Sequence, residues 1–165
     1  MNIKELFEIT SVRLGIKELS ELDDFEEVEE RILRYDNFCR RAITKRKLID
    51  QRSEFFWTFL AIVIHGNREL YHLNKLLSKK TKVSSKVAQL FERSYEIFKL
   101  LEQAYFQKDV SSLSKIHEIE KDAVYNKGYA ILKDKLSNES VIAFHLISCA
   151  RHFYLANSPL AGLIV

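Results

Sequence analysis

The sequence predicts an all-α protein in which two tandem three-helix bundles, six helices together, form one elongated helical domain. Apolar residues recur at three- and four-residue spacing along almost the whole chain, which is the period of one helical face. Only four Gly and one Pro occur among 165 residues, too few for the frequent turns of a β-rich chain. The third observation is an internal repeat, which decides how the helices are grouped.

The repeat is visible as residues that recur at a common offset. Asp23 and Asp36 return as Asp109 and Asp122, and Arg68-x-x-Tyr71-x-x-Asn74 returns as Arg151-x-x-Tyr154-x-x-Asn157. The second offset is three residues shorter than the first, as one shortened hairpin would produce. We therefore expect a first three-helix repeat over residues 1–80 and a second over residues 81–165. These repeated polar residues are predicted to be structural.

The first three helices are expected over residues 2–19, 24–46 and 53–79. Asp23 or Asp24 is a suitable N-cap for the second helix, whose acidic start and basic end complement the helix dipole. The third helix contains the most apolar run, residues 55–64. This run is half of the roughly 20 residues that a membrane span needs, so it predicts a buried helix.

The second set of helices is expected over residues 85–107, 110–134 and 138–164. Ser84 or Ser85 can cap the first of them, Asp109 the second, and Ser137 and Asn138 mark the start of the third. The third and the sixth helix of the chain are apolar nearly all round, unlike the other four. Helices of that kind belong in the centre of a protein, covered on several sides.

Composition and motifs limit the classes of function. A hydrophobic share of 47% and a net charge of +3 are ordinary for a soluble protein and demand no anionic partner. The N-terminal residues lack a basic region followed by an apolar stretch, so we expect no signal peptide and a cytoplasmic location. We find no Gly-rich phosphate loop, no Gly-x-Ser-x-Gly and no His-Glu-x-x-His. The sequence therefore predicts a protein that is not an enzyme.

One stretch carries a family resemblance. The residues from Lys108-Asp109-Val110 to Glu118-Ile119-Glu120-Lys121-Asp122 resemble the start of the second helix in the PhoU family. These phosphate-uptake regulators are built from two tandem three-helix bundles, and the likeness extends over most of the chain in helix order and repeat. In that family an acidic residue four positions before an Asp contributes to a metal site. Glu118 and Asp122 match this spacing, which places both carboxylates on one helical face.

The sequence departs from the family at its other acidic positions. The family's third-helix motif has an acid, then Arg, then Asp; here Arg68 and Arg151 keep the Arg while both acids are replaced. Ile32 stands where the first acid before Asp36 is expected. The resemblance therefore implies a scaffold or adaptor more than a metalloprotein. It implies a regulator of phosphate transport or phosphate signalling that contacts a transporter or sensor protein and is peripheral to the membrane through that partner.

Two ion pairs are predicted from helix geometry. Asp122 and Arg151 lie at nearly equal distances from the hairpin between the fifth and sixth helices, so antiparallel packing brings them to the same height. Asp36 and Arg68 are their counterparts in the first repeat. The favoured interpretation is a buried, repeated ion pair that fixes helix register. The alternative is a ligand or metal site in each half.

A metal site is the more specific of two interpretations of the polar residues on the sixth helix. His145, Cys149 and His152 share one face, and imidazole and thiolate suit zinc. Zinc or iron would need further ligands from another helix, and Glu118, Asp122 or His117 would have to converge on these residues. The competing interpretation is a semi-polar seam against a neighbouring helix. His65 and His72 are expected to be partly buried packing residues, since Glu69-x-x-His72 has no counterpart for a di-iron site.

The basic residues suggest a third kind of site. They gather at the end of the second helix and at the junction of the repeats, and could form one anion-binding surface: Arg40, Arg41, Lys45, Arg46, Lys79, Lys80 and Lys82. A small helical nucleic-acid-binding subunit is therefore the alternative function. The simpler interpretation is that these basic residues are solvated helix ends that bind no ligand. A metal-dependent bundle protein is a third class. A homodimer is also considered, because small two-bundle domains leave long apolar faces.

Overall fold

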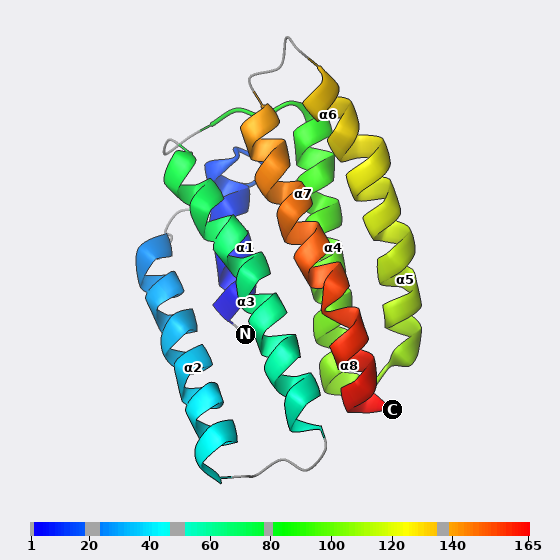
Figure 1. Ribbon diagram of the computed structural model, residues 1–165. Helices are drawn as coiled ribbons and strands as arrows, with labels where there is room; N and C mark the ends of the chain where they lie inside the picture. Colours follow the sequence, from blue (N-terminus) through cyan, green and yellow to red (C-terminus); the bar gives the residue numbers. More distant parts are fainter. Residues whose placement is uncertain (1, 19–23, 47–51, 78–80, 135–138) are drawn as a thin grey trace.

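The computed structural model describes residues 2–18, 24–46, 52–77, 81–134 and 139–165 (Figure 1). Within these ranges the chain is helical and forms no strand, so the all-α prediction is confirmed. The helices run in the order α1 (Asn2–Arg13), α2 (Phe25–Arg46), α3 (Ser53–Leu76), α4 (Ser85–Gln107), α5 (Val110–Lys121), the π-helix η1 (Asp122–Gly128), α6 (Tyr129–Lys133), α7 (Ser140–Leu155) and α8 (Asn157–Ile164).

The predicted N-caps that lie in the described residues are present. The Asp109 side chain accepts a hydrogen bond from the Ser111 backbone N–H at 2.9 Å, and Ser84 Oγ accepts one from the Val87 N–H at 3.4 Å. Asp24 accepts from the Glu26 N–H at 3.0 Å. Each bond satisfies a backbone donor at a helix start that has no partner inside the helix. Ser137 and Asn138 lie outside the described residues.

The first helix is shorter than predicted. It ends at Arg13 because Gly15 adopts a left-handed φ of +68°. The Gly15 N–H bonds to the Val12 carbonyl and the Ile16 N–H to the Ser11 carbonyl, each at 2.9 Å, which is the Schellman arrangement that closes a helix. The Arg13 guanidinium then donates to backbone carbonyls at the end of α3, at 2.7–2.8 Å.

The last two predicted helices are each divided. The predicted 110–134 helix contains the π-helix η1, and an added Cβ at Gly128 would lie 2.5 Å from Ile147 Cγ1. Glycine thus permits the close approach of η1 to α7. The predicted 138–164 helix divides at Ala156, where α8 follows α7. Pro159 has no backbone N–H to donate to the last turn of α7, which explains the division.

The two apolar helices lie in the centre, as predicted. α3 packs against α7, α8, α1 and α2, while α7 packs against α3, α4 and η1 (Figure 1). α1, α2 and α3 contact one another, as do α4, α5 and α7, but the most extensive contact, between α3 and α7, joins one group to the other. That the two groups are repeats, divided at residue 80, stays a prediction.

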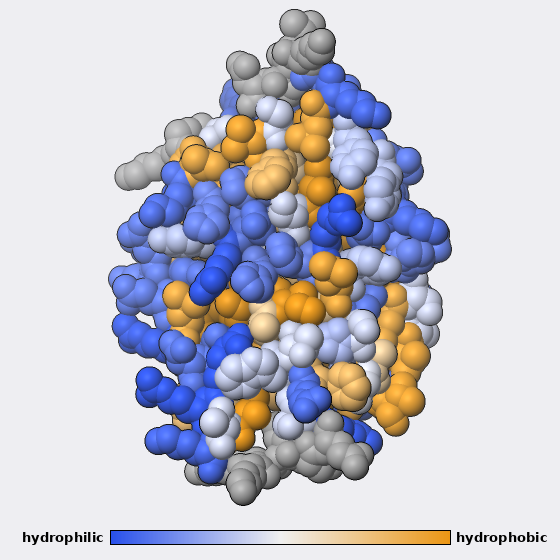
Figure 2. All heavy atoms as spheres, in the orientation of Figure 1, coloured by the Kyte–Doolittle hydropathy of each residue, from blue (hydrophilic) through white to orange (hydrophobic). Residues whose placement is uncertain are grey.

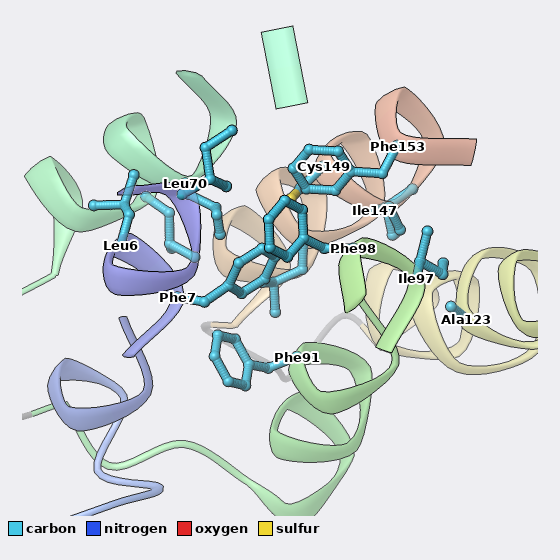
Figure 3. Close-up of a cluster of buried hydrophobic side chains, with 14 of the residues drawn as sticks. Leu6, Phe7, Leu70, Phe91, Ile97, Phe98, Ala123, Ile147, Cys149 and Phe153 are labelled. Atoms are coloured by element: carbon cyan, nitrogen blue, oxygen red, sulfur yellow. The ribbon is translucent and has the colours of Figure 1, made fainter. Parts of the chain in front are cut away.

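One hydrophobic core joins both groups. Phe7 of α1 is fully buried, with its ring centroid 5.4 Å from that of Phe98 on α4 and 6.0 Å from that of Phe153 on α7 (Figure 3). Because these aromatic side chains come from all parts of the chain, they fix α1, α4 and α7 relative to one another.

Candidate functional site

The predicted ion pair between Asp122 and Arg151 is wrong. Asp122 Oδ2 lies 3.6 Å from Arg93 Nε of α4 and 3.7 Å from Lys127 Nζ of η1, and Arg151 is exposed. Among the described residues no ion pair joins Asp122 to Arg151. Helix rise predicts the height of a residue but not the direction it faces, and Asp122 faces α4. Its side chain is 37% exposed, so its ion pairs stabilise the fold little.

The predicted pair between Asp36 and Arg68 is also wrong. Asp36 accepts two hydrogen bonds, each at 2.9 Å, from Arg40 Nε one turn further along α2. Arg68 is exposed on α3. The polar contact that does join α2 to α3 is buried, with the Asn67 amide donating to the Glu29 carboxylate.

Glu29 was missed by the sequence analysis. Burial raises the pKa of its carboxyl, although the hydrogen bond from Asn67 and the nearby charges of Arg68 and His72 lower it. The signal that could have found it is its place on the apolar stripe of α2, with Val28 and Ile32. An acid at such a position is expected to need a buried partner.

The repeated Tyr and Asn residues make different contacts in the two halves. Asn74 is buried and donates to Thr10 Oγ1 of α1 at 2.7 Å, whereas Asn157 donates to the Leu113 carbonyl of α5 at 3.2 Å. Tyr71 packs against Phe25, and Tyr154 packs against His117. All four residues thus have packing roles, but the two sets of partners do not correspond.

The five predicted metal ligands do not form one cluster. Glu118 is exposed on α5 and Asp122 faces α4, whereas His145, Cys149 and His152 lie on α7. In the part of the chain that the structure describes, no group of three or more His, Cys, Asp or Glu side chains is placed to hold a metal ion together. Cys149 is fully buried, and burial, together with the nearby Glu69 charge, raises the pKa of its thiol well above the ordinary value.

The histidines of α3 and α7 instead form two pairs across the helix boundary. The His65 and His152 rings are stacked with centroids 5.8 Å apart, and the His72 and His145 centroids are 6.4 Å apart. His145 Nδ1 lies 2.8 Å from Glu69 Oε2. His65 and His72 are exposed, so their predicted partial burial is wrong. Figure 2 shows hydrophilic residues gathered across the middle of the face that α3 and α7 form.

The predicted single anion-binding surface is wrong. Arg40, Arg41 and Lys45 lie near the end of α2, at the bottom of Figure 1, whereas Lys82 follows α3 at the opposite end of the molecule. Arg40 is bound to Asp36, and its guanidinium carbon lies 4.7 Å from the Trp57 ring centroid. Lys79, Lys80 and the side chain of Arg46 lie outside the described residues.

An apolar groove lies between α1, α2 and α3. α1 has 12 residues, whereas α2 has 22 and α3 has 24. In Figure 1 the N-terminus lies about halfway along α2 and α3, so α1 accompanies only their upper halves. The groove has a volume of about 390 Å³ and is lined by Ile3, Ile32, Tyr35, Asp36, Cys39, Leu60, Val63 and Ile64.

Exposed aromatic side chains lie on the two long helices that form this groove. Tyr35, which lines the groove, is 62% exposed, Phe38 one turn further along α2 is 70% exposed, and Trp57 of α3 is 40% exposed. Trp57 shares a helical face with the groove residues Leu60 and Ile64, at three- and four-residue spacing. Aromatic residues at a surface are typical anchors of protein–protein interfaces.

A larger cleft of about 580 Å³ lies on another side, between α1, α4 and η1. Arg93 binds Glu96 at 2.7 Å, and Arg93 and Lys127 both lie near Asp122. Basic and acidic side chains alternate along the lining, so neither sign of charge predominates to select a ligand: Glu8, Lys17, Glu92, Arg93, Glu96, Lys99 and Lys127.

Comparison of the chain with protein-family models, curated proteins and solved structures finds no match. In the described ranges, none of the helices combines the length and the apolar character needed to cross a membrane.

Proposed function

We propose that this chain is a non-enzymatic regulator or adaptor of phosphate transport or phosphate signalling that acts through protein–protein contacts. The phosphate role comes from the resemblance to the PhoU family. The observation that supports protein contact is the groove between α1, α2 and α3, with exposed aromatic side chains beside it. An exposed apolar groove of this kind is typical of proteins that receive a helix from a partner.

The occupant that fits best is an amphipathic helix of a transporter or sensor protein. α1 is ten residues shorter than α2, which corresponds to about 15 Å of helix. A partner helix of about three turns would therefore continue the row that α1 begins. Its apolar face would cover Tyr35 and Leu60, which line the groove.

The nucleic-acid alternative has less support. Its basis in the sequence was one basic surface, and the basic residues lie at opposite ends of α3. A metal-dependent bundle enzyme likewise has no converging group of three ligands in the described residues.

The proposal is tested with the double variant Tyr35→Ser/Phe38→Ser. The gene is deleted from its own organism and complemented with wild type, the double variant, or the control Phe144→Ser, whose side chain is 55% exposed on α7. Phosphate uptake and a phosphate-responsive reporter are measured at limiting and at ample phosphate. We expect wild type and the control to restore regulation and the double variant to fail, at equal protein levels.

The partner is then identified by placing a photo-crosslinking amino acid at position 38. Recovery of a phosphate transporter or sensor component supports the proposal, and a peptide from it should change the fluorescence of Trp57, the single tryptophan. A deletion strain with normal phosphate control contradicts the phosphate role. A crosslink only to a second copy of the chain, or to nucleic acid, contradicts the proposed partner.

A further inference from the structure

We propose that the two histidine pairs across the α3–α7 boundary, His65 with His152 and His72 with His145, each bind one divalent transition-metal ion. The ligand set differs from the predicted cluster of Glu118, Asp122 and the α7 residues. It takes one ligand of each pair from α3, and it does not depend on the phosphate role proposed above.

The spacing along each helix produces two separate pairs. His65 and His72 are seven residues apart on α3, and His145 and His152 are seven apart on α7. Seven residues are two helical turns, roughly 10.5 Å of rise, so two histidines of the same helix are too far apart to share an ion. Across the boundary, in contrast, the ring centroids are 5.8 Å and 6.4 Å apart.

Both histidines of α7 have the tautomer that a metal ligand needs. His145 Nδ1 lies 2.8 Å from the Glu69 carboxylate, and His152 Nδ1 lies 2.8 Å from the Ser148 carbonyl oxygen. A carboxylate and a carbonyl oxygen can only accept, so Nδ1 carries the proton in each ring. The lone pair of the neutral ring is therefore on Nε2. A histidine whose other nitrogen is held by a carboxylate or carbonyl is the usual arrangement around protein-bound metals.

The distances between the rings are slightly longer than a bridging ion needs. A metal–nitrogen bond is about 2.0–2.1 Å long, so the centroids of two rings that share an ion at a tetrahedral angle are about 5 Å apart. The observed separations of 5.8 Å and 6.4 Å would have to close by roughly an ångström on binding. Because His65 and His72 are exposed, their rings can turn toward the gap without disturbing the core.

The chemistry of the donors limits the class of ion. Imidazole nitrogens suit Zn²⁺, Ni²⁺ and Cu²⁺, whereas Mg²⁺ and Ca²⁺ prefer oxygen. Each pair supplies two nitrogens and leaves further positions for water. An ion at either pair would connect α3 to α7, the central helices of the two halves of the chain, and would stabilise the folded state by mass action.

The test is equilibrium dialysis of untagged protein against micromolar Zn²⁺ and Cu²⁺, with the bound metal measured by elemental analysis. We expect two ions per chain in wild type, one in His65→Gln or in His72→Gln, and none in the double variant. His117→Gln, which changes the one histidine outside the pairs, should still bind two. Melting without metal confirms that each variant is folded, and added Zn²⁺ should raise the melting temperature of wild type but not of the double variant.

One further result distinguishes built sites from chance binding to surface histidines. Glu69→Gln should weaken one of the two sites by tenfold or more and leave the other unchanged, because of the four paired histidines it is His145 that contacts Glu69. Equal binding by wild type and the double variant overturns the proposal, as does less than one ion per chain in wild type or an unchanged affinity in Glu69→Gln.

Discussion

Replacing Gly66 by alanine tests the close approach of α3 to α7, on which the histidine pairs depend. An added Cβ at this position would lie 2.8 Å from Phe153 Cε1 and 3.0 Å from Cζ. The Phe153 ring is fully buried, with its centroid 5.2 Å from that of Phe98 and 6.0 Å from that of Phe7. It therefore has no space into which it can retreat.

Two opposing effects decide the result. Alanine is favoured over glycine in a helix by about 1 kcal/mol, whereas overpacking a tight core costs about 1–3 kcal/mol. Three ring atoms of Phe153 lie within 3.1 Å of the new Cβ, so the upper half of that range applies. We expect Gly66→Ala to lower the free energy of unfolding by about 1–2 kcal/mol and the melting temperature by about 2–8 °C.

The measurement is urea and thermal unfolding followed by far-UV circular dichroism, within a double-mutant cycle. Leucine is smaller than phenylalanine, so Phe153→Leu should relieve the clash. Gly66→Ala should therefore lower the free energy of unfolding less in the Phe153→Leu background than in wild type. An increase in stability of about 1 kcal/mol, as for an exposed helical glycine, would refute the reasoning. Strictly additive effects of the two changes would refute it as well.

Three other predictions concern single ionisable groups. Hydrogen bonds from the Ser112 and Ser111 hydroxyls lower the pKa of Asp109 from 3.8 to about 2, so its contribution to stability is present above about pH 4 and is lost as the pH falls through about 2. Asp109→Asn should unfold more readily at pH 7 and should lack this acid-dependent loss in urea titrations. For Glu29 the sign is reversed: burial raises its pKa above 4.5, so the stability that it contributes at low pH is lost as the pH rises through the raised pKa. Glu29→Gln should therefore gain stability relative to wild type as the pH rises above the ordinary Glu pKa of 4.5, and parallel curves of stability against pH would contradict this account. Finally, Cys39 lines the groove whereas Cys149 is fully buried, so Ellman's reagent should modify one thiol per native chain and the second only after unfolding.

The sequence by itself determined where most of the helices form and which two of them lie in the centre. Ser84 and Asp109 act as caps through bonds to residues two or three positions away, so the signal is local and can be read from the chain. The apolar character of α3 and α7 likewise required a central position wherever they packed. The early end of α1 was also encoded locally, by Gly15, although the spacing of apolar residues alone did not reveal it.

Only the tertiary structure decided which polar side chains meet. The periodicity of a helix gives the height of a residue along the axis, but the rotation of each helix depends on how all its neighbours pack. Asp122 therefore faces Arg93 rather than Arg151, and His145 lies beside Glu69 and His72 of α3, which is far away in the sequence. The groove arises in the same way, because it is the difference in length between α1 and its neighbours that leaves the faces of α2 and α3 uncovered.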